Sequence, residues 1–502
     1  MNGKVKRANE AIENSHESWP RVRLGDLCQI IRGVSYKKNQ ASGQPVKGSV
    51  PILRATNIQD GDLLLDANLV YVPADLVSEE QLLSVGDIVV ATSSGSKHLV
   101  GKTAQVKEPW TGSFGAFCAV LRPKVEIDHR YLGYYFGSKE YKDYITKKAL
   151  GVNINNLRRG DLEEIMVPLA PPDQQKRTVA EIEKQFSRLD EGVNNIKRVK
   201  ANLKRYKAAV LKAAVEGRLV ETEDEIARRE GRDYETGEQL LQRILRERRR
   251  KWEEAELAKM QAKGKAPKND KWKQKYKEPA APDTTNLPEL PEGWVWANVG
   301  QLALVGTGAT PKRSESRYYG GNIPWVTSAV VNSEQVTHPT KYVTKAALNE
   351  TNISLYPPGT LLVAMYGEGK TRGKCAELAI EATTNQALAA LETDKSIRRY
   401  LKLFLDYNYE ETRKAASGGV QPNLNLSLIR AILIALPPLA EQHRIVDEVD
   451  RRLSILRETE AQVEANLQRA ERLRQSILAA AFSGRLAMEP METMQPENKE
   501  AV

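Results

Sequence analysis

Residues 364–371 read AMYGEGKT and follow the apolar run 361–363, so they match a relaxed phosphate-binding pattern that would serve ATP hydrolysis. Such a loop must open into a helix whose N-terminus faces the phosphate. Here RGKCAELAIEATTNQ follows, which is typical of a returning strand. A strand, a tight turn and a second strand fit this stretch better than a nucleotide site.

Other catalytic patterns are equally poor. The three Pro-Pro pairs lack the preceding Asn or Asp and the following Tyr or Phe of an amino-methyltransferase, and neither Pro-Asp pair is followed by the motif of a metal-dependent nuclease. The five histidines are scattered, which disfavours metal clusters and hydrolytic triads. We therefore predict a non-catalytic chain with no catalytic residue, no metal site and no cofactor of its own.

Length and composition limit the class of protein. A chain of 502 residues exceeds a single core and indicates roughly three or more units. Cys28, Cys118 and Cys375 lie far apart, and the sequence has neither a signal-peptide core nor an apolar run of ~18 residues, so we expect a cytoplasmic protein without membrane segments. The net charge of +10 is concentrated in residues 243–278, where 14 Lys or Arg oppose 6 Asp or Glu. Global charge alone is weak evidence for a nucleic-acid partner.

The sequence contains an internal repeat. PPDQQKRTVAEIEKQFSRLD from Pro171 parallels PLAEQHRIVDEVDRRLSIL from Pro438, and AVLKAAVEGRL from Ala209 parallels SILAAAFSGRL from Ser476, both at a constant offset of 267 residues. Upstream segments match more weakly but in the same order. Each half is thus a variable portion followed by a better matched C-terminal segment.

The matched segments have helical periodicity. Apolar residues recur at steps of three and four in both, with a spacing near 3.5 residues that requires a partner helix. Proline-rich starts and the glycines at 217 and 484 suit the two ends of each helix. Mutual antiparallel packing of the two helices is favoured over packing onto their own halves. The residues predicted for the helix and subunit interfaces are Gln175, Arg177, Val179, Ile182, Phe186, Leu189, Gln442, Arg444, Val446, Val449, Leu453 and Leu456.

The variable portions are expected to be mixed α/β. Apolar runs at 87–91 and 360–364 are typical of strands, and 131–145 and 397–409 of helices. The first half has ATSSGSKH where the second has AMYGEGKT, so Gly-Lys-Thr is not a property of the repeated unit. Residues 221–291 are interpreted as a charged helix from Glu238 to about Ala262 and a flexible or extended linker.

Polar, basic and aromatic residues gather at matched turns of the two halves. Arg and Lys suit phosphates and guanine edges, and Asn suits adenine edges. Two such readers held apart by a rod would recognise two short DNA sequences at a fixed spacing. The predicted DNA-binding residues are Arg32, Tyr36, Lys37, Lys38, Arg54, Asn57, Ser93, Ser94, Lys97, Lys102, Thr310, Lys312, Arg313, Trp325, Thr327, Tyr366, Lys370, Arg372 and Lys374.

The paired pattern of a proline-rich start, a Gln, a basic residue, a long helix and Gly-Arg-Leu resembles the specificity subunit of type I restriction-modification enzymes over nearly the whole chain. RGVSYKK, ILRATNI, SSGSKHLVGK and SFGAFC are similar to one type of target recognition domain in that family. The resemblance implies two such domains on double-stranded DNA, helices that set the spacer and dock two methyltransferase subunits, and motor-nuclease subunits that join for cleavage. S-adenosylmethionine, ATP and magnesium would belong to these partners.

The expected fold is α/β (α+β), with two mixed α/β domains separated by two long antiparallel coiled-coil helices in a pseudo-twofold repeat. The charged segment exceeds the minimal central region of the family, and its role stays open between a docking arm, a DNA-contacting arm and a linker. A coiled-coil protein-binding adaptor is the alternative, and an ATP-driven enzyme a third. The expected divisions are an N-terminal tail at 1–18, recognition domains at 19–172 and 291–438, spacer helices at 173–220 and 439–487, the charged segment at 221–290 and a C-terminal tail at 488–502.

Overall fold

The computed structural model divides into two compact units. The first contains residues 1–198 and 463–502, and the second contains 199–462. Each unit has mixed α/β structure and its own cores, as expected. The structure describes residues 19–59, 61–94, 99–124, 127–149, 156–264, 267, 269–366, 371–415 and 424–487.

In the first unit a four-stranded sheet has the order β2-β10-β7-β8, and a three-stranded sheet has the order β6-β3-β9. β7 is fully buried because it pairs on both sides, which explains its uninterrupted apolar sequence. The strands are β1 (Arg21–Arg23), β2 (Cys28–Arg32), β3 (Ser49–Leu53), β4 (Ile58–Gln59), β5 (Asp62–Leu63), β6 (Val70–Pro73), β7 (Ile88–Ala91), β8 (Thr103–Gln105), β9 (Ser113–Phe114), β10 (Cys118–Pro123) and β11 (Met166–Pro168).

The second unit repeats this plan. Its larger sheets have the orders β13-β21-β18-β19-β15 and β16-β14-β20-β17, and β12 pairs with β22 as β1 pairs with β11. The strands are β12 (Val295–Asn298), β13 (Ala303–Thr307), β14 (Tyr319–Val326), β15 (Gln335–Val336), β16 (Lys341–Val343), β17 (Leu355–Tyr356), β18 (Leu361–Ala364), β19 (Cys375–Leu378), β20 (Ala382–Thr384), β21 (Leu388–Thr393) and β22 (Leu433–Leu436).

Several further helices accompany the strands of each unit. The helix expected over 131–145 is two helices that break around Gly137, where Ser138 Oγ accepts a hydrogen bond from the Tyr141 amide. The helices of the first unit are α2 (Leu24–Leu27), α3 (His129–Tyr135), α4 (Lys139–Ala149) and α5 (Arg159–Glu163). Those of the second are α7 (Glu223–Glu230), α8 (Gly237–Ala262), α9 (Val299–Leu302), α10 (Lys345–Glu350), α11 (Arg398–Ala415) and α12 (Leu426–Arg430).

Two long helices run through both units, α6 (Pro172–Val215) and α13 (Leu439–Phe482). Both end where expected, because Gly217 and Gly484 follow them with positive φ angles of 68° and 82°. In the first unit Phe186 near the start of α6 packs beneath Arg474 near the end of α13, 4.3 Å from the guanidinium carbon to the ring centroid. In the second unit the end of α6 shares a core with the start of α13.

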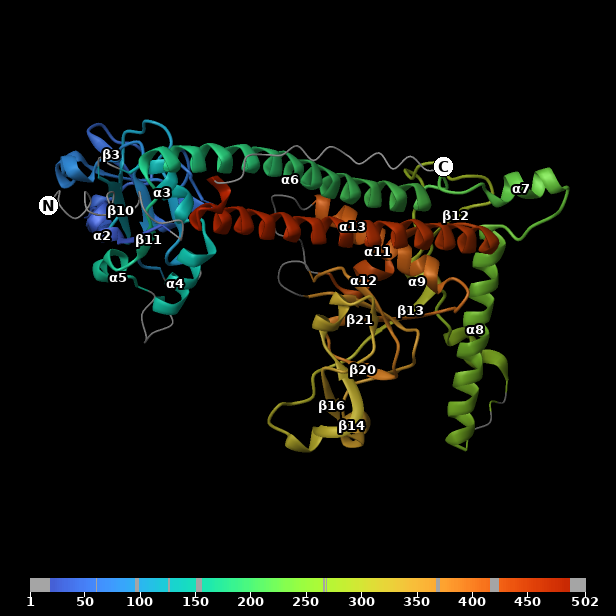
Figure 1. The fold of residues 1–502 in the computed structure, drawn as a ribbon. Coiled ribbons are helices and arrows are strands. Elements are labelled where there is room, and N and C mark those ends of the chain that lie inside the picture. The colour runs from blue at the N-terminus through green and yellow to red at the C-terminus, as the bar shows by residue number, and fades with distance from the viewer. Residues whose placement is uncertain are drawn as a thin grey trace, which may run out of the picture. The chain divides into compact units, whose positions relative to one another are not determined.

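The charged segment is more ordered than the sequence predicts. Helix α8 runs away from β12, and its C-terminal turns lie apart from the strands (Figure 1). Residues Asp270–Lys275 form a 3₁₀ turn that returns along α8, with the Trp272 ring stacked on the Trp252 ring at 6.2 Å between centroids. The prediction of a flexible or extended linker is therefore wrong at this turn, because the two tryptophans bury each other.

Candidate nucleic-acid interface

In the first unit three loops meet where β2, β3 and β7 end. The Val34 amide donates to the Phe114 carbonyl at 2.7 Å, and the Gly115 amide donates to the Leu53 carbonyl at 2.8 Å. The Phe117 carbonyl accepts from the amides of Thr92 and Ser93. These bonds bring the polar stretches after β2, β3 and β7 onto the short loop between β9 and β10.

The second unit builds the same junction. The Asn385 amide donates to the Val326 carbonyl at 3.1 Å, and the Met365 amide donates to the Ala387 carbonyl at 2.8 Å. A side-chain bond is added here, because Thr310 Oγ1 donates to Gln386 Oε1 at 2.7 Å. The convergence of the three loops is therefore a property of the repeated fold.

A glycine after the first strand lets the strands approach in both junctions. A Cβ atom on Gly33 would lie 2.2 Å from the Gly115 carbonyl oxygen, and one on Gly308 would lie 1.7 Å from the Thr384 carbonyl oxygen. Neither glycine has a positive φ angle, so the requirement is close packing rather than backbone conformation.

The strands that flank AMYGEGKT and ATSSGSKH agree with the expected order of a strand, a turn and a second strand. β18 pairs with β19 and β7 with β8, both antiparallel, and within the described residues each stretch leads to a strand rather than to an α-helix. A phosphate-binding loop is thereby disfavoured on geometry. Lys97 and Lys370 were predicted to touch DNA from these loops, and both lie outside the described residues.

Most of the predicted DNA-binding residues of the first unit have accessible side chains. Arg32, Lys37, Lys38 and Arg54 are exposed, and Arg54 Nη2 donates to the Asn68 carbonyl at 2.8 Å. Burial raises the pKa of Tyr36, which is half-buried. The side chains of Ser93, Ser94 and Lys102 are also half-buried.

Asn57 requires a correction. Its side chain is fully buried, Nδ2 donates to the carbonyls of Leu64 and Ala67, and Oδ1 accepts from the Arg54 amide. All three bonds hold the turn after β3, so the amide is occupied and does not reach a base edge. Asn57 positions Arg54 instead.

In the second unit Lys312 and Arg313 are exposed, and Tyr366 is 41% exposed. Trp325 requires the same correction as Asn57, because it is only 6% exposed and its Nε1 donates to the Ala309 carbonyl. It belongs to the core beneath the junction. The half-buried predicted residues are Thr310, Thr327, Arg372 and Lys374.

The long helices place their predicted interface residues in two ways. Gln175 and Gln442 are buried rather than available to a partner, and each Nε2 donates 2.8 Å to the backbone carbonyl five residues earlier. They fix the start of each helix to the preceding strand. The buried apolar residues of the set are Val179, Ile182, Phe186, Val446, Val449 and Leu456, and Leu189 and Leu453 are half-buried.

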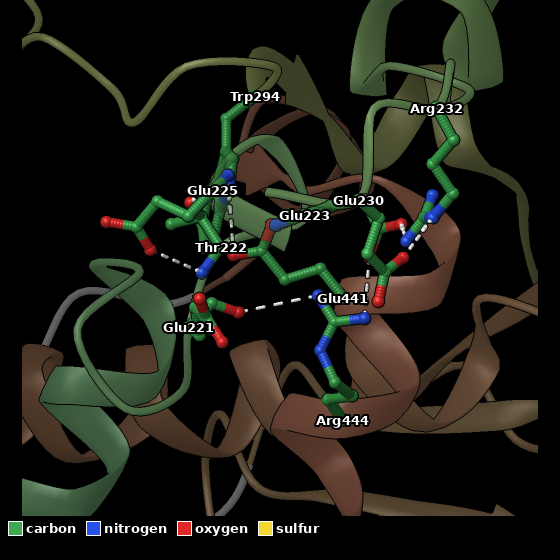
Figure 2. Close-up of polar contacts among 9 residues, drawn as sticks. All are labelled: Glu221, Thr222, Glu223, Glu225, Glu230, Arg232, Trp294, Glu441 and Arg444. Carbon is green, nitrogen blue, oxygen red and sulfur yellow. Dashed lines mark hydrogen bonds and ion pairs between the residues drawn. The ribbon is translucent and has the colours of Figure 1, made fainter. Parts of the chain in front are cut away.

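The start of α13 carries a polar cluster of which the sequence indicated only Arg444 (Figure 2). Glu441 is buried and its two oxygens accept from the Glu223 amide at 2.9 Å and from Trp294 Nε1 at 3.0 Å. Burial raises the pKa of the Glu441 carboxyl to about 7. Arg444 Nη1 lies 2.6 Å from Glu223 Oε2, and Arg232 binds the other oxygen of Glu223 at 2.7 Å.

The first unit has a simpler version of this cluster. Trp19 Nε1 donates to Gln174 Oε1 at 3.1 Å, where the second unit has Trp294 and Glu441. Arg177 matches Arg444 in the repeat but is exposed, and the described residues offer it no ion pair. The repeat in the sequence indicated Gln175 and Gln442 and the matching Arg177 and Arg444. It gave no indication that α7 contacts the start of α13.

Within the described residues, no group of three or more His, Cys, Asp or Glu is placed to hold a metal ion. In the same part of the chain, no helix is long and apolar enough to cross a bilayer. Cys28 and Cys118 are buried, and burial raises the pKa of each thiol to about 12.

Comparisons with known proteins place these junctions in context. A family model described as "Type I restriction modification DNA specificity domain" matches residues 16–205 and 291–469. The chain is 27% identical over 480 residues to the type I restriction enzyme StySPI specificity subunit of Salmonella potsdam, and 28% identical over 481 residues to the EcoKI specificity subunit of Escherichia coli K12. Each match covers 94% of this chain and 89% of the relative.

One solved structure shares the fold along most of the chain. That structure comes from work on the complex assembly and conformational transition of the type I R-M system. The match has a TM-score of 0.59 at 19% sequence identity. The alignment covers 93% of this chain and 98% of that one.

Proposed function

Because the chain belongs to the type I restriction modification DNA specificity family and is a DNA specificity subunit, we propose that its two junctions read the two halves of a bipartite, asymmetric DNA site. The observation that carries this proposal is the convergence of three loops in both units, with matching backbone hydrogen bonds at two of the loops and different side chains along the junction. A shared backbone arrangement that carries different side chains on its loops suits the recognition of two different short sequences.

Exposed cations support a DNA-facing role for the junctions. Arg32 and Arg54 in the first unit, and Lys312 and Arg313 in the second, can contact phosphates or guanine edges. The proposed recognition domains span 19–172 and 291–438. Affinity for DNA should fall steeply with salt, which a protein-binding adaptor would not require.

The long helices are proposed to pair as an antiparallel coiled coil that sets the spacer between the half-sites. Each has 44 residues, which is about 66 Å at ~1.5 Å per residue. In the first unit the start of α6 meets the end of α13, and in the second the end of α6 meets the start of α13, as an antiparallel pair requires. The proposed spacer helices are 173–220 and 439–487, with the charged segment 221–290 between the halves.

The chain is proposed to act without an active site of its own. Methyltransferase subunits dock on the helices, motor-nuclease subunits join for cleavage, and S-adenosylmethionine, ATP and magnesium serve in those partners.

A domain exchange tests the proposal. Residues 19–170 are replaced with the first recognition domain of another specificity subunit, and methylated adenines are mapped by long-read sequencing of DNA modified by the assembled complex. One half-site should change, while the other half-site and the spacer length stay the same. If both half-sites are unchanged, the assignment of reading to the two units is wrong.

A further inference from the structure

The loop between β9 and β10 carries an exposed apolar side chain, which a search for charged or hydrogen-bonding residues would miss. Phe117 is 69% exposed, the highest exposed fraction among the large apolar side chains of the described residues. Its neighbours in sequence are held tightly, because Phe114 is fully buried and Cys118 is 1% exposed. A phenyl ring is thus displayed at the centre of the first junction.

The backbone at this position is fixed before any ligand binds. The Phe117 carbonyl accepts two amide hydrogen bonds from the residues after β7, and the Cys118 carbonyl accepts one from Gly33. Only the two side-chain torsions of Phe117 remain to be ordered on binding. The entropic cost of using this ring as a contact is therefore small.

The charges on the segments bonded to this loop favour nucleic acid over a protein partner. Arg32 precedes Gly33, which is bonded to the loop, and Arg54 follows the strand that pairs with Phe114. Both guanidinium groups are exposed. Cations that can hold phosphates thus lie on segments that meet at the loop, and the loop carries an apolar group that can meet a thymine methyl or an unstacked base, which are apolar contacts known from DNA readers.

We propose that Phe117 makes the apolar base contact of the first unit and contributes to the sequence that this unit reads. The inference rests on the proposed function of the junctions. It also predicts an asymmetry, because the position of Phe117 is taken by Ala387 in the second unit, whose carbonyl accepts the matching amide bond from Met365. The loop between β20 and β21 should therefore make no matching ring contact with the second half-site.

Phe117→Ala tests the proposal in the full chain assembled with its methyltransferase subunits. Fluorescence anisotropy with a duplex carrying the mapped site should show binding roughly 5- to 100-fold weaker, the range for loss of one stacked or apolar base contact. Binding to a duplex that lacks the first half-site should not change. Met166→Ala is the matched control, because Met166 is also an exposed apolar residue of this unit but lies in β11, away from the junction.

Two kinds of base substitution in the duplex identify which base contact Phe117 makes. Thymines of the first half-site are replaced one by one with uracil, and adenines with 2-aminopurine. If Phe117 meets a thymine methyl, one uracil weakens the wild-type complex and not the Phe117→Ala complex. If it meets an unstacked base, one 2-aminopurine brightens only in the wild-type complex.

Three results would overturn the proposal. The affinity of Phe117→Ala for the mapped site could be unchanged, or its affinity for DNA without the site could fall by the same factor. The third is that the variant fails to assemble with the methyltransferase subunits but keeps its preference for the mapped site. The last would make Phe117 a protein contact. Failure of the proposed function is a separate result, because the wild-type complex would then not prefer the mapped site at all.

Discussion

The two units share a frame and differ in what the frame displays. In the first unit an amide after β7 donates to the loop between β9 and β10, and in the second unit an amide after β18 donates to the loop between β20 and β21. In both units a glycine permits the close approach of the backbone. At the tip, Phe117 of the first unit corresponds to Ala387 of the second, and Arg54 corresponds to Thr327. Backbone hydrogen bonds do not depend on side-chain identity, so the geometry of the junction can persist while its recognition surface changes.

The starts of α6 and α13, by contrast, differ in the contacts that hold them. In the second unit the charged segment is fastened to α13 through Glu223, Glu441 and Arg444, whereas in the first unit Gln174 binds Trp19 and Arg177 is exposed. A neutral pair stands at the start of α6. An ionised cluster serves where α7 is held in place.

The strongest test of the shared frame is Gly308→Ala. Its Cβ would lie 1.7 Å from a backbone oxygen, so the two strands must separate, and we expect the free energy of unfolding to fall by about 4 kcal/mol with loss of the second half-site. Urea denaturation and methylation mapping measure the two effects. Gly43→Ala is the control, because a Cβ there meets nothing within 4 Å. An unchanged midpoint for Gly308→Ala would show that close approach is dispensable.

A pH titration separates the two helix starts. The folded pKa of Glu441 is about 7, above the ordinary 4.5, so the folded state binds more protons than the unfolded state between these values. The free energy of unfolding should therefore fall as pH rises from about 4.5 to about 7, by up to about 3 kcal/mol, and level off above.

Glu441→Gln should remove the part of this slope that Glu441 contributes, because it places in the second unit the neutral residue that Gln174 provides in the first. Glu223 does not mask the effect. Burial opposes its ionisation, but Arg444 and Arg232 hold its pKa below the usual value, so its contribution is lost only below about pH 4.5. Denaturation midpoints at intervals of pH for both proteins provide the measurement, and a slope that persists in Glu441→Gln would assign it to another group.

Paired arginine substitutions sharpen the same contrast. Arg444→Ala leaves the buried Glu223 carboxylate with Arg232 alone, and we expect a loss of about 2 kcal/mol in the free energy of unfolding. Arg177→Ala, at the matching position of the first unit, should cost less than about 0.5 kcal/mol because the side chain is exposed. Equal losses in both variants would mean that the ion pair contributes no stability of its own.

The sequence reveals whatever repeats or alternates along the chain, and little that depends on distant neighbours. The 267-residue offset, the helix ends at Gly217 and Gly484 and the strand character of the AMYGEGKT region follow from local pattern. Asn57 and Trp325 were assigned to DNA by residue type, but tertiary contacts bury both. The anchoring of α7 had no periodic signal because it depends on partners 218 residues apart.

The smallest expected effect concerns a single phosphate contact at the second tip. Lys312 is exposed beside Thr310, whose hydroxyl ties this loop to Gln386. Lys312→Ala should weaken DNA binding by about 1 kcal/mol, evenly across sequences, and lower the slope of log affinity against log salt by about 1, because one fewer phosphate is neutralised. Lys345→Ala, an exposed lysine of α10 outside the junction, is the control. If the loss appears only on the mapped site, Lys312 reads a base and the second tip carries its specificity on a cation where the first carries it on a phenyl ring.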